Sequence, residues 1–260
     1  MTAPAAQFES AFGKSNELLN RVQDEFEKMV SNVNSIADWL PDFVWRKVKD
    51  GIQEVSRLID RLFKELTDFF TQPGSPGALW DAAKAWTEQV GAKTSELSAS
   101  LKIDQLRTDN EWDGTAATAY KDSIASQQDS LKAIKSATDA LDSSLNELAG
   151  AIIAFWVALG AALATYVSAM IAAALACATA VGALPGVAAA VTATGVVIAA
   201  VAAFATALAT YLNTIKTQQA SMRQQLANND AFPGGKWPRS TTDISDASVT
   251  DGDDTDWQVQ

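Results

Sequence analysis

Few side chains in this sequence could perform acid–base, nucleophilic or metal chemistry. The 260 residues include no histidine and a single cysteine, Cys177. Imidazole bases, histidine metal ligands and histidine-based triads are therefore excluded. One cysteine can build neither a zinc nor an iron–sulfur site, nor an intrachain disulfide. Because Cys177 lies in an apolar stretch, we expect a small buried residue rather than a reactive thiol.

Three short motifs resemble ligand-binding loops but lack residues that binding requires. Gly91–Thr94 has no glycine before its lysine, and Gly234–Trp237 has tryptophan where a phosphate loop needs serine or threonine. The acidic stretch Asp251–Asp256 lacks the final glutamate and the flanking helices of a calcium loop. We therefore predict that the protein is not an enzyme and has no cofactor-binding or metal site.

The charge balance and the first residues limit the partners and the location. The chain has 20 Lys and Arg against 31 Asp and Glu, a net charge of −11. A nucleic-acid partner, which requires a basic face, is not expected. Residues 1–8 have neither the basic region nor the apolar core of a Sec signal peptide. We predict a protein that is secreted, or associated with the cell envelope or a membrane, without such a peptide.

Helices must position any functional residue in this chain. Apolar residues at steps of three and four predict one helix from Phe8 to Leu40 and a second from Val48 to Phe69. Charges of both signs fill the other face of the second helix, as expected of a helix that contacts water. Thr71–Gly77, with two prolines and two glycines, marks the end of this N-terminal hairpin.

The most unusual feature is a run of 68 residues, Leu148–Ile215, with 26 alanines and no Asp, Glu, Lys or Arg. A break at Gly182–Gly186, which contains Pro185, predicts two helical legs folded back on each other. Each leg is roughly 45–50 Å long as a helix, and a membrane span needs only about 20 residues. The hairpin is therefore either inserted in lipid or buried in a helical bundle, and both alternatives remain open.

The first leg carries large side chains on one face and small ones on another. Alanines four residues apart, at Ala154, Ala158 and Ala162, let two backbones approach closely, so we expect the two legs to pack tightly there. The large side chains would face lipid or other helices. Together with the turn, the predicted membrane or assembly surface is Phe155, Trp156, Leu159, Leu163, Tyr166, Met170, Gly182, Pro185 and Gly186.

A Trp-x-Gly motif lies between two further predicted helices. A third helix runs from Leu79 to about Leu101, and a fourth begins near Thr115 and continues without a break to about Val181. Between them stand Trp112 and Gly114, and Ala116-Ala117-Thr118-Ala119-Tyr120 follows. Glycine allows a tight turn, and a tryptophan at a hairpin tip is a rigid apolar anchor that either caps a core or docks a partner.

This pattern resembles the WXG100 (ESAT-6-like) superfamily, the helical hairpins handled by type VII secretion systems, and its larger actinobacterial relatives. The resemblance covers about residues 77–147. It implies that Trp112, Gly114 and Tyr120 form a partner or export motif, and that the partner is the secretion machinery or a second WXG100-like chain. The Tyr-x-x-x-Asp/Glu export signal of the family is missing. The three tyrosines are followed four positions on by Ile124, Met170 and Ile215.

We therefore predict an all-α fold, an elongated helical bundle that combines a W-x-G hairpin with a long apolar hairpin able to insert in a membrane. The predicted segments are an N-terminal amphipathic hairpin (1–72), a WXG100-like hairpin (77–147), an apolar Ala-rich hairpin (148–215), a polar helix end (216–227) and a disordered acidic tail (228–260).

Two functions fit these segments. The first is a non-enzymatic, exported type VII secretion-associated protein that binds partner helices and inserts or assembles at a membrane, including with copies of itself. The second is a resident membrane-anchored scaffold or immunity protein of the cell envelope. Basic residues flank only the open end of the apolar hairpin, which by the positive-inside rule places both termini in the cytoplasm. They are Lys132, Lys135, Lys216 and Arg223.

Overall fold

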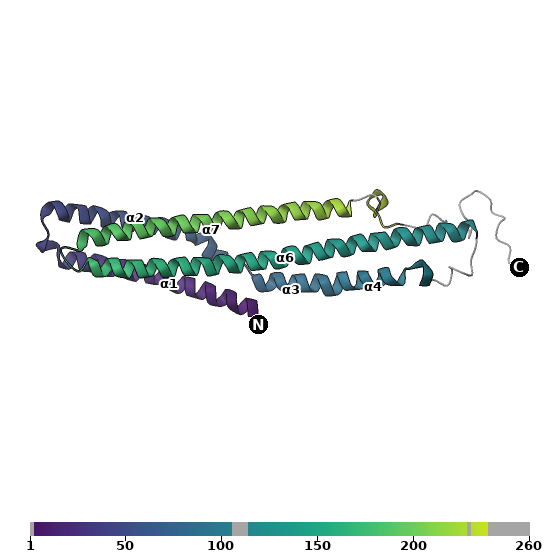
Figure 1. Cartoon of the computed structure of the whole chain (residues 1–260), viewed down its shortest axis with the longest axis horizontal. Coiled ribbons are helices and arrows are strands. Elements are labelled where there is room, and N and C mark those ends of the chain that lie inside the picture. Colours follow the sequence, from purple (N-terminus) through teal and green to yellow (C-terminus); the bar gives the residue numbers. More distant parts are fainter. Residues whose placement is uncertain (1–2, 106–113, 228–229, 239–260) are drawn as a thin grey trace. The chain divides into compact units, whose positions relative to one another are not determined.

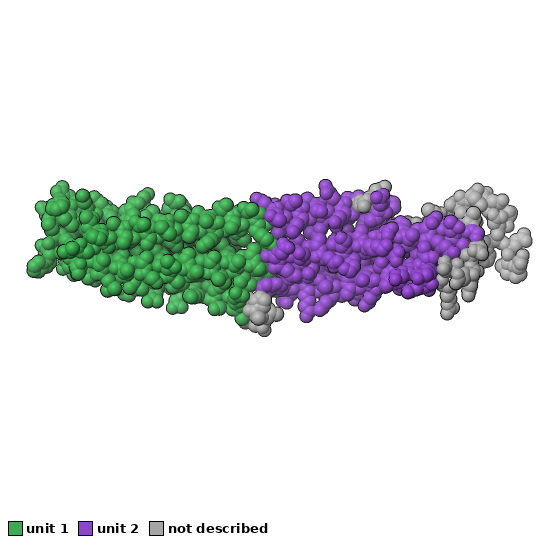
Figure 2. Space-filling view, in the orientation of Figure 1, with its two compact units in different colours: residues 1–78, 148–212 green, residues 79–147, 213–260 purple. Residues whose placement is uncertain are grey.

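The computed structural model describes residues 3–105, 114–227 and 230–238, and within these ranges it contains helices and turns but no strand. The all-α prediction is confirmed for this part of the chain. Two compact units are formed (Figure 2): unit 1 comprises residues 1–78 and 148–212, and unit 2 comprises residues 79–147 and 213–260. The long helices α6 (Thr115–Ala176) and α7 (Ala183–Leu226) contribute to both units (Figure 1).

Unit 1 pairs the N-terminal hairpin with the uncharged hairpin. Helices α1 (Ala3–Ser35) and α2 (Asp42–Thr71) are joined through the short 3-10 helix η1 (Ala37–Trp39). Their predicted apolar seams are confirmed. The seam residues that are fully buried include Val22, Met29, Val33, Val48, Val55 and Leu62.

Two polar features of α1 and α2 fit this packing. Ser15, the polar residue in the α1 seam, is buried and donates its hydroxyl to Ala11 O at 2.8 Å, so its polar group is satisfied within the helix. On the outer face of α2, the guanidinium of Arg57 binds Glu54 at 2.6 Å and that of Arg61 binds Glu65 at 2.7 Å. The charged face of α2 is therefore directed toward water, as predicted.

The connection between the two apolar helices differs from the prediction. Helix α6 ends at Ala176 and α7 begins at Ala183, so the chain turns at residues 177–182 and not at Gly182–Gly186. Pro185 is the third residue of α7. Proline is tolerated there because the first N–H groups of a helix have no partner within the helix. Proline therefore marked the start of α7 rather than a break between helices.

Gly186 has a packing role instead of a turn role. A Cβ at this position would stand 2.7 Å from Cys177 Sγ and 2.8 Å from Ala173 O. The first turn of α7 can therefore lie against the end of α6 only because residue 186 has no side chain. Cys177 is fully buried in this contact, as expected from the sequence.

In unit 2, helices α3 (Pro76–Trp86) and α4 (Ala92–Ser100) are separated by a π-helical turn, η2 (Thr87–Gly91). The predicted seam of this segment is partly wrong, because Trp86 is 44% exposed and Leu97 is 56% exposed. A π-turn inserts an extra residue and rotates the following helix. Gly91, the last residue of the turn, and Thr94 of α4 are buried.

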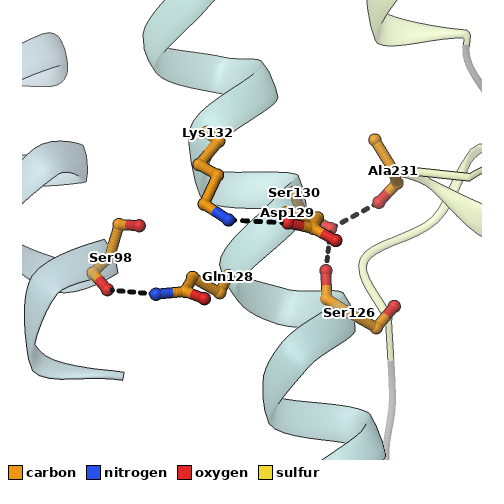
Figure 3. Close-up of polar contacts among 7 residues, drawn as sticks. All are labelled: Ser98, Ser126, Gln128, Asp129, Ser130, Lys132 and Ala231. Carbon is orange, nitrogen blue, oxygen red and sulfur yellow. Dashed lines mark hydrogen bonds and ion pairs between the residues drawn. The ribbon is translucent and has the colours of Figure 1, made fainter. Parts of the chain in front are cut away.

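A short C-terminal segment, residues 230–238, packs on α6 and includes the 3-10 helix η4 (Pro233–Gly235). Ser130 donates a hydrogen bond to Ala231 O, and Gln128, on the same helix, donates to Ser98 O of α4 at 3.1 Å (Figure 3). Gln127 reaches Pro238 O at 3.4 Å. The predicted disorder from residue 228 is therefore wrong for residues 230–238, where buried hydroxyl and amide groups hold the backbone. The predicted tail beyond 238 lies outside the described residues.

A substitution at Gly186 tests the close packing of α6 and α7. We expect Gly186→Ala to unfold with a free energy about 1–3 kcal/mol below that of Gly195→Ala, because the new methyl group overlaps a backbone oxygen. Gly195 is a matched control, since it lies in the same helix and a Cβ there meets nothing within 4 Å. Urea unfolding measures both. Equal stability of the two variants would contradict the packing role.

Candidate functional site

The inner face of the uncharged hairpin is buried in unit 1. All six large side chains that were predicted to form a functional stripe on α6 face inward, and none is more than 7% exposed; they are Phe155, Trp156, Leu159, Leu163, Tyr166 and Met170. The sequence predicted that this stripe would face either lipid or other helices. In this conformation it contacts other helices.

An aromatic cluster joins α1, α2 and α6 at the start of the uncharged run. Trp156 is 1% exposed, and its ring lies edge-on to Phe12 of α1 at 4.9 Å and to Phe70 of α2 at 5.0 Å between centroids. Its indole Nε1 donates to Pro73 O at 3.0 Å. A buried tryptophan needs such a partner for its N–H. Trp156 therefore holds α1, the end of α2 and the α2–α3 connection to one point of α6.

Further contacts hold the covered face along the two legs. Near the end of α6, Asn32 of α1 donates its side-chain amide to Ala174 O at 2.8 Å. Between the legs, the hydroxyls of Tyr166 and Thr194 are 2.9 Å apart and both residues are buried. Ala174 lies in the last turn of α6, where carbonyls have no i+4 partner within the helix, and Ala178 N donates to Leu175 O instead. The Asn32 amide therefore supplies a donor to this helix end and links α1 to α6.

The opposite face of the hairpin is exposed and uncharged. Both α6 and α7 are long and apolar enough to cross a membrane, yet only 39% and 33% of their most apolar stretches are buried. Exposed side chains on this face include Val157, at 44%, and Val196, at 65%. Ordinary surface helices direct a polar, usually charged face to water. The hairpin is thus covered on one side only, which the sequence prediction of either lipid or a fully covered bundle did not anticipate.

The two legs separate at the base of the hairpin. A groove of about 300 Å³ lies between α6 and α7. Its lining residues are Ala151, Ala154, Phe155, Ala158, Phe204, Ala207, Leu208 and Tyr211. The expected tight packing through Ala154 and Ala158 is therefore wrong at this level. Phe155 and Phe204 line the groove, whereas the first turn of α7 lies against the end of α6 near Gly186.

The W-x-G motif is only partly described. Trp112 lies outside the described residues. Gly114 is exposed and has φ +110°, a conformation that favours glycine and directly precedes α6. Tyr120 is half-buried on the first turns of α6. The described part of unit 2 thus contains two of the three predicted motif residues, both close to the start of α6.

The three short motifs that resemble ligand-binding loops lie in separate parts of the chain. Residues 91–94 lie at the junction of the π-turn and α4, and Lys236 and Trp237 are exposed. Among the described residues, no group of three or more Cys, Asp or Glu is placed to hold a metal, and every buried side-chain nitrogen and oxygen has a hydrogen-bond partner. The acidic stretch 251–256 lies outside the described part.

Comparisons of the chain with protein-family models, curated proteins and solved structures gave no match. The resemblance to the WXG100 superfamily therefore rests on the sequence pattern alone: the Trp-x-Gly motif, the Ala-Ala-x-Ala-Tyr that follows it and their place between two predicted helices. Over the described residues, the structure is that of an all-α protein with two helices long and apolar enough to span a membrane.

Sequence analysis missed the partners of Trp156. Phe12 lies in a predicted seam, but Phe70 lies beside its seam and Pro73 was recognised only as part of a helix boundary. The contact joins residues 83 positions apart, from Pro73 to Trp156. Periodicity within one helix carries no information about such a pair.

Trp156 offers a direct test of this cluster. We expect Trp156→Ala to lower the free energy of unfolding by about 3–5 kcal/mol, because it removes a large buried side chain. Trp156→Phe should cost less, since it keeps most of the ring packing and loses the bond to Pro73 O. Trp39→Ala, at an 80% exposed tryptophan of the same unit, is the control and should change stability by under about 0.5 kcal/mol. Urea unfolding that ranks the three differently would contradict the role assigned to Trp156.

Proposed function

We propose that this chain is a non-enzymatic helical protein that inserts its uncharged α6–α7 hairpin into a membrane, and that it reaches that membrane by type VII secretion. The observation that carries the membrane part is the one-sided cover of the hairpin. Its inner face is buried, while the outer face exposes apolar and small side chains without a charge along residues 148–176 of α6 and 183–215 of α7.

The covering helices decide what insertion requires. Helices α1 and α2 carry charged residues along their outer faces, such as Arg21, Asp24, Lys49 and Asp60. In a bilayer centre each charged side chain costs about 2.5–3.5 kcal/mol on insertion scales. The hairpin therefore cannot cross a bilayer with α1 and α2 still packed along it. Insertion requires the α1–α2 pair to separate from α6 and α7.

The separated α1–α2 pair has a suitable place at a membrane surface. Both helices have an apolar seam, interrupted in α1 by Ser15, and carry charged residues on the opposite face. Helices of this kind lie in the interface with the seam toward the acyl chains. The same seam can therefore cover the hairpin in water and contact lipid after insertion, which lowers the free energy lost when the pair leaves the hairpin.

Cross-linking α1 to α6 tests this requirement. Ser15 Oγ lies 3.3 Å from the position of a Cβ at residue 160. In a Cys177→Ala background, a Ser15→Cys/Gly160→Cys pair should close under oxidation and hold α1 on α6. We expect the oxidised chain to lose carbonate-resistant association with phosphatidylcholine vesicles and to regain it after reduction.

The reduced double variant and the oxidised Cys177→Ala chain are the controls, and both should insert. Insertion of the oxidised, cross-linked chain at the full level would contradict the separation of α1 from the hairpin. Failure of the unmodified chain to associate with vesicles at all would overturn the proposed membrane function.

The secretion part of the proposal is supported by the resemblance of residues 77–147 to WXG100 hairpins. Trp112 and Gly114 would then contact the secretion machinery or a second WXG100-like chain. We expect Trp112→Ala to reduce the secreted fraction, measured by immunoblot of medium and cells, whereas Trp237→Ala, at an exposed tryptophan outside residues 77–147, should leave it unchanged. Normal export of Trp112→Ala would remove the support for this part.

The alternative, a resident membrane-anchored scaffold or immunity protein, is favoured by the basic residues at the open end of the hairpin. Lys132 and Lys135 are paired with Asp129 and Asp139, at 2.9 and 2.6 Å, and the turn at residues 177–182 contains no charge. Fractionation of the producing cells separates the two functions. Recovery in the medium supports export, and recovery only in carbonate-washed membranes supports the resident anchor.

A further inference from the structure

We propose that unit 1 first contacts a lipid bilayer through one end, where the α1–α2 and α6–α7 connections meet. The proposal rests on the proposed membrane function and adds where the protein binds and to what. Five exposed apolar side chains form this surface, here called the tip patch: Trp39, Phe43, Leu175, Val181 and Leu184.

The tip patch comes from two segments far apart in the sequence. The bond from Asn32 near the end of α1 to Ala174 O near the end of α6 places the two connections at the same end of unit 1. Gly51 of α2, which lies against Val187 of α7, places the starts of the two returning helices there as well. Figure 1 shows both connections at that end of the unit.

The exposure of these side chains is large. Trp39 is 80% exposed, Phe43 63% and Val181 91%. Other large apolar side chains of unit 1 are buried in its core, whereas these three lie outside it. Tryptophan and phenylalanine at the end of a helical hairpin fit the interfacial region of a bilayer, where amphipathic aromatic rings are enriched.

The α6–α7 connection is built to enter an apolar phase. Backbone N–H groups in a bilayer need partners within the protein. Cys177 N donates to Ala173 O, Ala178 N to Leu175 O and Thr179 N to Ala176 O, at 2.9–3.2 Å. Gly182 N donates to Thr179 Oγ1 at 3.1 Å. These bonds lower the free energy needed to move the connection from water into an apolar phase.

The length behind the patch also favours lipid over a second copy of the chain. From the connection, each leg continues uncharged for more than the roughly 20 residues that cross a bilayer. A copy seated on the patch would cover five side chains and leave the exposed faces of the legs in water. A bilayer can receive the patch first and the legs afterwards.

Charge indicates which membrane is bound. The exposed residues Asp38 and Asp42 are sequence neighbours of Trp39 and Phe43, and the α6–α7 connection has no basic residue. The chain as a whole carries −11. Binding should therefore depend on apolar burial and should be at least as strong on phosphatidylcholine vesicles as on phosphatidylglycerol vesicles at low salt.

Environment-sensitive labels on the full chain test the order of contact. In the Cys177→Ala background, one label is placed at Val181→Cys in the patch and another at Val196→Cys on the exposed side of α7. The chain also carries the Ser15–Gly160 cross-link, closed before labelling. With phosphatidylcholine vesicles, we expect the cross-linked chain to show a blue shift and fluorescence gain at residue 181 and no change at residue 196.

A second set of variants uses vesicle flotation without labels. Trp39→Ser/Phe43→Ser should bind phosphatidylcholine vesicles about tenfold or more weakly, because two large apolar side chains no longer leave water. Trp86→Ser, at an exposed tryptophan of unit 2, should bind as the unmodified chain does. Both substituted positions in the patch are exposed, so folding should be retained, and circular dichroism checks this.

The outcomes separate the two proposals. Unchanged binding of Trp39→Ser/Phe43→Ser, or a label response at residue 196 before residue 181, would overturn the tip patch while the membrane function stands. No vesicle binding by the unmodified chain would overturn both. A dimer in solution that Trp39→Ser abolishes, together with no response of the residue-181 label to vesicles, would assign the patch to a second copy and overturn the lipid proposal.

Discussion

An uncharged hairpin that needs cover is the constraint on which the structure of unit 1 depends. From Leu148 to Ile215 the chain offers water no charged side chain, and burial of apolar surface stabilises a fold by about 25 cal/mol per Å². The seams of α1 and α2 supply that burial on one side. The aromatic cluster around Trp156 and the bond from Asn32 to Ala174 O fix the two hairpins at both ends of their contact.

No described helix of unit 1 covers the outer face of the hairpin. Helices α1 and α2 can cover only one face of the α6–α7 hairpin, because their charged faces must remain in water. The remaining apolar surface is then available to lipid. Under the proposed insertion, the seams that cover the hairpin in water would contact lipid instead, which would reduce the free-energy difference between the two conformations.

Small residues decide where the legs come together. Near Gly186 the absence of a side chain allows the legs to touch, and at Phe155 and Phe204 bulky rings leave a groove. Alanine at four-residue spacing was therefore not sufficient to bring the backbones together, because neighbouring aromatic side chains on the same level set the separation. The position of the turn before Ala183 agrees with this packing, because Pro185 is tolerated in the first turn of α7.

Local sequence signals determined the helices, the two apolar seams, the uncharged run and the absence of histidine chemistry, because periodicity and composition act within one segment. Tertiary structure alone decided that α1 and α2 cover one face of the hairpin, that the turn lies at residues 177–182, and that residues 230–238 pack on α6. It also brought the α1–α2 connection to the same end of unit 1 as the α6–α7 connection. Such pairings join residues far apart along the chain, and their energies depend on shape complementarity between faces that no single segment encodes.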